Sequence, residues 1–451
     1  VHNKEEVDLR GDVAAIARKL TKMEGPAVLH ENIRGYPGWR ILNNSLNSAQ
    51  KVGWATGLEP QSLVRDLAGK MGHSVPPMQV ASGPCKELKF FGDDVDLFKI
   101  PVPFSGEYEG TPNFTAGFSN VVDPETGWQN VAVRRFGLKG KNVLSEMINQ
   151  AQQDVLIWGK YTMLGKQMPC AIVVGADPMT YMCALTKAPV GYCEYELWGV
   201  LTGTPLEVVK CETSDIVVPA SAELVIEGYL DSKDRELDGP FPEFLGYYTQ
   251  LTRVAKFHAT CITMRKDPIF WYFHEGWGNT EGDFAAHFAM TAGLYRELIN
   301  KVPGIINVWT NPFTSGVGTI VQVAKAVAKT YPGIARQIAG VASSVSPLQK
   351  YVWVIDEDVE DPTNLNDMLY ALVNKFQASK DVQIWSRGVG CMQNPAELWA
   401  GQWGWDDTIV LDCTEKPPPY DEGYRRGKAL PPADATEKVE RNWTKYGFPA
   451  A

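Results

Sequence analysis

Short apolar runs separated by turns rich in glycine and proline dominate the chain up to about residue 280. Their length and their β-branched residues are typical of strands. The clearest runs are residues 27–29, 171–174, 206–210 and 224–227. Longer amphipathic stretches at 13–23 and 143–164 predict helices between them. This mixture predicts an α/β or α+β fold rather than a regular βαβ array.

The pattern changes after residue 283, where helical periodicity continues to 305. The following segments predict a helix at 321–339, a strand at 351–355, a helix at 365–376 and a strand at 382–385. This alternation predicts a second α/β domain. We therefore expect four parts: a first domain at 1–282, a connecting helix at 283–302, the second domain at 303–428, and a tail at 429–451. A stiff proline linker at 416–420 would precede the tail helix, which would dock on a neighbouring subunit.

Composition narrows the class of protein. The 451 residues are 44% hydrophobic and 21% charged, which is typical of an ordinary soluble globular protein. A net charge of −10 argues against nucleic acid or an anionic membrane as the main partner. Eight cysteines without a C-x-x-C pair predict reduced thiols. With no apolar run of spanning length, we expect a cytoplasmic protein.

Two carboxylates stand out in the segment Asp238-Gly-Pro-Phe-Pro-Glu243. Its glycine and two prolines predict a rigid turn. A carboxyl group among aromatic side chains is poorly solvated, which raises its pKa and lets it hold and transfer a proton. The alternative is a surface turn whose acids face water.

Two further segments combine charge with strand-like patterns. Asn130 to Arg135 could offer backbone groups to a phosphate and a guanidinium to a carboxylate. An edge strand with solvated arginines is the alternative. Glu194 and Glu196 would share one face of a strand at 192–199.

Other catalytic motifs are missing from the sequence. The six histidines show no metal-binding spacing, and His287 lies on an apolar helical stripe, which favours a core position. The chain contains no P-loop, no nucleophile elbow and no Rossmann glycine motif.

Taken in order, these segments resemble the UbiD family of prenylated-FMN-dependent (de)carboxylases over nearly the whole chain. The matching segments are 25–29 with 35–38, 130–135 with 140–142, Glu194 with 199–203, 209–212, 218–228, 238–243 and 439–447. The resemblance implies a flavin-binding split-β-barrel-like domain at 1–282, and a C-terminal α/β oligomerisation domain.

The resemblance also implies a catalytic set of Arg135, Asp238 and Glu243. Arg135 would orient the substrate carboxylate, and Glu243 would donate the proton. The implied activity is the non-oxidative, reversible decarboxylation of an aromatic, heteroaromatic or α,β-unsaturated acid. The alternatives are a flavin oxidoreductase, or an inactive flavin-binding or assembly protein on the same fold.

The family pattern further implies where ligands bind. Asn130, Gln153 and Glu194 would hold a divalent cation, Mn²⁺ or Mg²⁺, with K⁺ as a further candidate. Ala132, Val133, Arg134, Arg135 and Gln152 would contact the prenylated FMN. Phe244 and His287 would line the substrate pocket. The expected partners are a flavin prenyltransferase as cofactor source and further copies of the chain in a homodimer or larger homo-oligomer.

Three positions depart from the family pattern. Asp238 stands where many relatives have Glu, and its shorter arm alters the reach to Arg135. Gln153 replaces a metal-ligating His, which weakens any preference for soft metals. Thr408 stands where a phosphate-binding Lys is expected.

Overall fold

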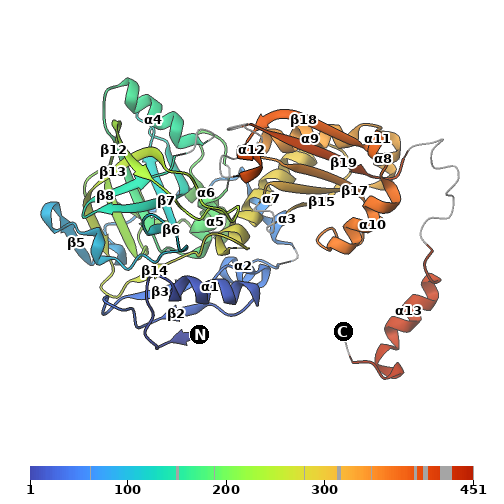
Figure 1. Cartoon of the computed structure of the whole chain (residues 1–451), viewed down its shortest axis with the longest axis horizontal. Helices are drawn as coiled ribbons and strands as arrows, with labels where there is room; N and C mark the ends of the chain where they lie inside the picture. The colour runs from blue at the N-terminus through green and yellow to red at the C-terminus, as the bar shows by residue number, and fades with distance from the viewer. Residues whose placement is uncertain are drawn as a thin grey trace.

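Six antiparallel strands form a closed barrel in the larger lobe of the protein, on the left in Figure 1. The computed structural model describes residues 1–60, 62–148, 152–186, 188–278, 280–311, 316–346, 348–390, 394–399, 405–416 and 429–449. The barrel strands are β6 (Asn113–Val122), β7 (Gln129–Gly140), β8 (Val143–Glu146), β9 (Met168–Val174), β12 (Leu224–Asp238) and β13 (Thr252–Met264). Their order is β12-β9-β6-β7-β8-β13, and pairing of β12 with β13 closes the ring. Strand β5 (Leu88–Phe91) pairs with β13 outside it.

Strand β9 shows why its sequence reads as a continuous apolar run. Ala171 and Val173 belong to one hydrophobic core, and Cys170, Ile172 and Val174 belong to another. Alternate side chains of a strand point to opposite faces, so both faces of β9 are buried. Burial on both sides makes the barrel the rigid centre of the lobe.

Smaller elements surround the barrel. Strands β1 (His2–Asn3), β2 (Val28–His30), β3 (Arg40–Asn43) and β14 (Ile269–Trp271) form one sheet; β4 (Met78–Gln79), β10 (Glu207–Lys210) and β11 (Val217–Pro219) form another. The helices of this lobe are α1 (Asp12–Lys22), α2 (Ala49–Thr56), α3 (Leu63–Lys70), α4 (Gln153–Met163), α5 (Pro178–Ala184) and α6 (Glu194–Thr202). Because β14 follows the barrel in sequence and pairs with β3, it joins the N-terminal segment to the barrel.

The second lobe contains a five-stranded sheet of order β15-β16-β17-β19-β18, on the right in Figure 1. Its strands are β15 (Ile305–Thr310), β16 (Gly318–Val323), β17 (Tyr351–Asp356), β18 (Val382–Val389) and β19 (Trp405–Cys413). The central strands β16, β17 and β19 are parallel. Helix α9 (Ile334–Val345) packs into one core against the sheet and α10 (Leu365–Lys375) into another. The remaining helices are α8 (Lys325–Thr330), α11 (Ala378–Asp381) and α12 (Pro395–Trp399).

Two predicted helices are wrong in part. The stretch 143–164 begins with strand β8, because the turn at 140–142 folds β8 back onto β7, and α4 begins only at Gln153. The stretch 321–339 contains the end of β16 and two helices, since Gly333 adopts a φ of 97° that interrupts the helix. Most of the predicted linker at 416–420 lies outside the described residues.

The tail helix α13 (Ala433–Arg441) lies apart from both lobes in Figure 1. Val439, Trp443, Tyr446 and Phe448 are all exposed. The seven cysteines within the described ranges are free thiols. Among the residues that the structure describes, no helix combines the length and apolarity needed to cross a bilayer.

Helix α7 (Glu281–Lys301) lies between the two lobes and is fixed at its first residue. The buried carboxylate of Glu281 accepts hydrogen bonds from the backbone N–H groups of Asn44, Ser45 and Leu46 at 2.5, 2.6 and 2.8 Å. The Ser45 hydroxyl donates a further bond at 2.5 Å. Charge-assisted hydrogen bonds of this kind are about twice as strong as neutral ones. Glu281 therefore ties α7 to the loop after β3.

We predict that Glu281→Gln lowers the thermal midpoint of unfolding by about 5 °C, because an amide cannot accept all four bonds and leaves buried N–H groups unsatisfied. Scanning calorimetry or intrinsic fluorescence measures the midpoint. The matched control is Glu297→Gln on the same helix, whose carboxylate forms a half-exposed pair with Lys301. It should shift the midpoint by about 1 °C at most. Equal midpoints for the two variants would contradict the role of Glu281.

Candidate active site

The predicted acid pair lies on a tight turn at the end of β12. Asp238 is the last residue of the strand, and Gly239 follows with a φ of 89°. A Cβ atom on residue 239 would lie 2.7 Å from the carbonyl oxygen of Gln250, so only glycine fits. The turn is held by bonds from Glu243 N–H to Tyr247 O at 3.0 Å and from Thr249 N–H to Phe241 O at 2.8 Å. The predicted turn is therefore present and is closed by backbone hydrogen bonds.

Arg135 on β7 lies between the two acids. Its Nη1 is 2.7 Å from Asp238 Oδ2, and its Nε donates to Glu243 Oε1 at 3.0 Å. The guanidinium carbon lies 4.4 Å from the centre of the Phe241 ring, and Ser145 donates to Asp238 Oδ1 at 2.7 Å. Both acids are buried. The structure thus brings the three predicted catalytic side chains together, and the shorter arm of Asp238 reaches Arg135.

The guanidinium of Arg135 carries N–H groups that make no hydrogen bond within the described residues. Neither Nη1 nor Nη2 of Arg135 has a hydrogen-bond acceptor among the described residues, and the Nη1–Asp238 contact is an ion pair outside the N–H direction. A buried donor without an acceptor is costly, which favours a ligand that supplies one. A carboxylate of a bound substrate has the required oxygens.

The net effect of burial and neighbouring charges at this site is to raise the pKa values of both Glu243 and Arg135. Burial raises the pKa of Glu243, and Asp238 adds to the rise, whereas Arg135 opposes it. The two carboxylates raise the pKa of Arg135 by more than burial lowers it. The guanidinium therefore stays charged, while the protonated form of Glu243 is favoured relative to an exposed glutamate.

Three further acids lie near this set, and two of them, Glu109 and Glu275, were missed by the sequence reasoning. Burial raises the pKa of Glu109 to about 7 and that of Asp283 to about 7. The pKa of Glu275 is raised well above its ordinary value by burial and by Asp283, Glu243 and Glu109. Glu275 comes shortly after the apolar segment 269–273. An acid next to such a segment could have been identified from the sequence as a candidate site residue.

The predicted cofactor strand is β7, which carries Asn130, Ala132, Val133, Arg134 and Arg135. Arg134 forms a buried pair with Asp154, with Nη2–Oδ2 at 2.6 Å. It is therefore paired inside the protein rather than solvated, which excludes the edge-strand alternative. Because side chains alternate along a strand, Arg135 points to the opposite face from Arg134.

The sequence predicted that Glu194 lies on a strand at 192–199. This prediction is wrong, because Glu194 is the first residue of helix α6. The N–H of Cys193 bonds to Glu196 across the first turn, and such a capping box starts a helix. Glu194 points inward and accepts a bond from Val131 N–H at 2.8 Å, while Glu196 accepts a bond from Ser74. The two acids thus have different surroundings.

The surroundings of Glu194 fit a cation. Burial raises the pKa of this carboxyl to about 8, and Arg134, the cation that acts on it, is already paired with Asp154. The neighbouring Asn130 is buried and can offer an amide oxygen. Gln153 donates its amide to Ala188 O at 2.7 Å, which leaves its amide oxygen for other contacts. One carboxylate with amide oxygens suits a hard cation.

The remaining predicted residues lie on several elements of both lobes. Gln152 immediately precedes α4, and Phe244 follows Glu243 in the turn, half-buried. His287 is buried on α7, and its Nδ1 lies 2.9 Å from the Thr310 hydroxyl of β15. Its Nε2 has no partner in the described part of the chain. Thr408 is buried in β19, where its hydroxyl donates to Gln349 O at 2.6 Å.

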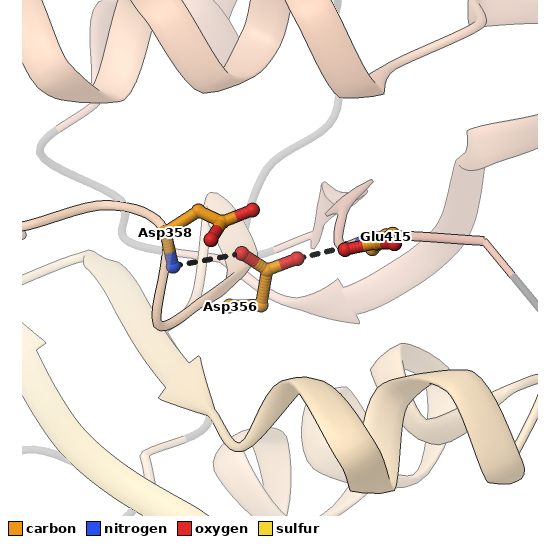
Figure 2. Close-up of side chains that lie close together, drawn as sticks. All are labelled: Asp356, Asp358 and Glu415. Carbon is orange, nitrogen blue, oxygen red and sulfur yellow. Dashed lines mark hydrogen bonds between the residues drawn. The ribbon is translucent and has the colours of Figure 1, made fainter. Parts of the chain in front are cut away.

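A second acidic cluster lies in the other lobe (Figure 2). Ligand oxygens of Asp356, Asp358 and Glu415 lie within 4.8 Å of one another at the carboxyl ends of β17 and β19. Lys375 contacts Asp356 at 2.6 Å and Asp358 at 2.6 Å. Lys325 contacts Asp358 at 3.0 Å and Glu415 at 2.5 Å, and Lys329 also contacts Glu415 at 2.5 Å. Three ammonium groups balance three carboxylates, so this cluster is an internal ion network that holds α8 and α10 to the sheet.

The chain matches three family models in order. They are described as the 3-octaprenyl-4-hydroxybenzoate carboxy-lyase N-terminal domain at residues 1–71, the Rift-related domain at 78–276 and the C-terminal domain at 284–413. Together they account for most of the sequence, including β7, the acid turn and α6.

Solved structures agree with these matches. The UbiD-class enzyme HmfF from Pelotomaculum thermopropionicum, in complex with FMN, is 25% identical with a TM-score of 0.86, over 96% of this chain and 95% of that one. Vanillic acid decarboxylase from Sedimentibacter hydroxybenzoicus, in closed form, is 28% identical with a TM-score of 0.88, over 99% and 95%. The apo 3,4-dihydroxybenzoic acid decarboxylase from Enterobacter cloacae shares the fold at 24% identity, with a TM-score of 0.84 over 97% and 96%. By its family models and its full-length structural relatives, this chain belongs to the UbiD family of carboxy-lyases.

Proposed function

We propose that the protein catalyses the non-oxidative, reversible decarboxylation of an aromatic, heteroaromatic or α,β-unsaturated carboxylic acid with prenylated FMN. The observation that carries the proposal is the buried Arg135, held by Asp238 and Glu243 with guanidinium N–H groups left over. The FMN complex of HmfF supports a flavin in this fold, and the vanillic acid decarboxylase supports an aromatic acid as substrate.

In this proposal Arg135 binds the substrate carboxylate through its free N–H groups, and Asp238 balances the charge of Arg135. Loss of CO2 from an sp² carbon leaves an electron pair there, and bound prenylated FMN supplies the electron sink that this requires. Glu243 is ionised while CO2 departs. It then takes up a proton and delivers it to the vacated carbon. The net change replaces the carboxylate by hydrogen.

The metal and cofactor contacts complete the proposal. Asn130, Gln153 and Glu194 would hold Mn²⁺ or Mg²⁺ beside the flavin phosphate, with K⁺ as a further candidate. The backbone of Ala132, Val133 and Arg134, together with Gln152, would contact the cofactor. A flavin prenyltransferase would supply it. The exposed aromatic side chains of the tail support a homo-oligomer in which α13 packs on a neighbouring copy.

The test of the activity uses protein co-produced with a flavin prenyltransferase. Wild-type protein should carry prenylated FMN by visible spectrum and intact mass, and should release CO2 from a panel of aromatic and unsaturated acids. We predict that Glu243→Gln keeps the cofactor but lowers turnover and solvent deuterium exchange at least about a hundredfold, because the proton donor is lost. Glu236→Gln, two residues before the acid turn, is the control and should retain activity. Plain flavin with redox turnover would favour an oxidoreductase, and normal turnover in Glu243→Gln would refute the role of that residue.

We predict that Glu194→Gln loses the metal, because an amide lacks the charge that offsets the buried cation. Metal content by elemental analysis and titration of the metal-free protein should show affinity at least about a hundredfold weaker. The control is Glu196→Gln on the same helix, which should bind metal normally. Stoichiometric metal in Glu194→Gln would exclude the site.

We predict that His287→Ala changes substrate ranking, because the free Nε2 can bond a ring hydroxyl or heteroatom. The ratio of kcat/KM between hydroxylated and unsubstituted aromatic acids should change by about tenfold. His258→Ala serves as control, since that ring bonds to Asp234 and stacks on Tyr229 instead. An unchanged ranking would remove His287 from the substrate pocket.

A further inference from the structure

Glu275 lies beside the proposed proton donor but outside the set of groups that the mechanism uses. It follows β14 by four residues, and its N–H bonds to the Ser105 hydroxyl at 3.4 Å. Its side chain makes no hydrogen bond within the described part of the chain and is partly exposed, in contrast to the buried Glu243. No fixed hydrogen-bond partner among the described residues therefore holds the carboxyl of Glu275 in one orientation.

The segments that carry Glu275 and Glu243 are in contact. A Cβ atom on Gly276 would lie 3.3 Å from the Pro242 side chain, so the residues next to each acid touch. The ring of Trp277, which follows Gly276, packs edge to face on the ring of Tyr247 from the acid turn, with ring centres 5.7 Å apart. Trp277 is exposed, so this junction reaches the surface. The segments of the two acids therefore meet at a junction that has one exposed side.

The start of helix α7 leaves space for this carboxyl. Oε1 of Glu275 lies 3.1 Å from the point where a Cβ of residue 282 would be placed, and glycine at that position keeps the space open. The side chain of Asp283 bonds to the Thr280 N–H and hydroxyl at 2.9 and 3.0 Å and is thereby fixed. Glu275 is the acid that remains free to move.

Charged and titratable groups face Glu275 from every neighbouring element. They are Glu109 after the 105–106 loop, Arg135 of β7, Glu243 of the acid turn, Asp283 of α7, the adjacent His274, and the buried Tyr181 and Tyr272. Burial lowers the pKa of His274 to about 4, so this ring is neutral and adds no positive charge. The acids outnumber the guanidinium that they share, which favours a carboxyl that carries its proton at neutral pH.

We propose that Glu275 is the positioning and relay acid that passes a proton from solvent to Glu243 within each turnover, after CO2 has departed. The inference rests on the proposed function. Once CO2 has departed, the proton of the Glu275 carboxyl passes to the ionised Glu243 carboxylate, which delivers it to the vacated carbon. Glu275 then takes a proton from water or buffer. In the carboxylation direction the proton moves from Glu243 to Glu275 and then to solvent. No electron or co-reactant is needed, because only a proton changes place.

The test compares Glu275→Gln with Glu107→Gln in cofactor-loaded protein; Glu107 is an exposed acid of the neighbouring loop. We predict that Glu275→Gln lowers kcat at least about tenfold with unchanged KM and cofactor content, because Glu243 is reprotonated slowly. Small buffer acids at increasing concentration should restore the rate in this variant alone, and Glu275→Asp should restore it in part. Since Glu275 must be protonated to act, wild-type kcat should fall as pH rises through its raised pKa, and this limb should vanish in Glu275→Gln.

A second measurement needs no turnover. The infrared spectrum of the cofactor-free protein at neutral pH should contain a protonated-carboxyl band that Glu275→Gln removes and Glu107→Gln keeps. A wild-type rate, pH profile and infrared band in Glu275→Gln would overturn the relay while leaving the proposed function intact. Normal turnover in Glu243→Gln would instead overturn the proposed function itself, so the two failures are distinguishable.

Discussion

The ion pair network of Arg135 with Asp238 and Glu243 is the interaction on which the candidate site depends. A buried guanidinium is tolerated only where carboxylates and hydrogen bonds replace its water. Here the replacement is incomplete, since Asp238 and Glu243 use one edge of the group and leave Nη2 without an acceptor. The barrel makes this possible, because β7 and β12 hold the backbone on both sides of the pair. Rigid strands maintain an arrangement that flexible loops would relax.

The site contains more carboxyl groups than cationic groups, and this excess favours protonation of some of the carboxyl groups. Asp238, Glu243, Glu109 and Glu275 all interact electrostatically with Arg135. A single guanidinium cannot offset that many carboxylates in a poorly solvated region, so some of these groups retain protons near neutral pH. Glu109 is held by Asn113 and by the N–H groups of Ser105 and Gly106, which fix it in place.

The sequence predicts the acid turn well and its surroundings poorly. Asp238 to Glu243 could be identified because glycine, prolines and aromatic residues next to two acids restrict both backbone and solvation within one short segment. Glu109, Glu275 and Asp283 are brought to the same place by long-range packing, and no local pattern encodes that. Strand β8 and helix α6 were misread for the same reason: a short apolar run with interspersed charges fits either period. Pairing with β7 and β13 makes residues 143–146 a strand, and the capping box makes residues 194–202 a helix.

Helix α7 links the site to the rest of the molecule. Glu281 binds the N-terminal loop at 44–46, Asp283 faces the acids around Arg135, and His287 contacts β15 of the second lobe. These residues fall within two turns of one helix, so a rigid rod of about 1.5 Å rise per residue connects three parts of the fold. The same helix therefore connects the acids around Arg135 with the second lobe, although none of the three catalytic side chains comes from that lobe.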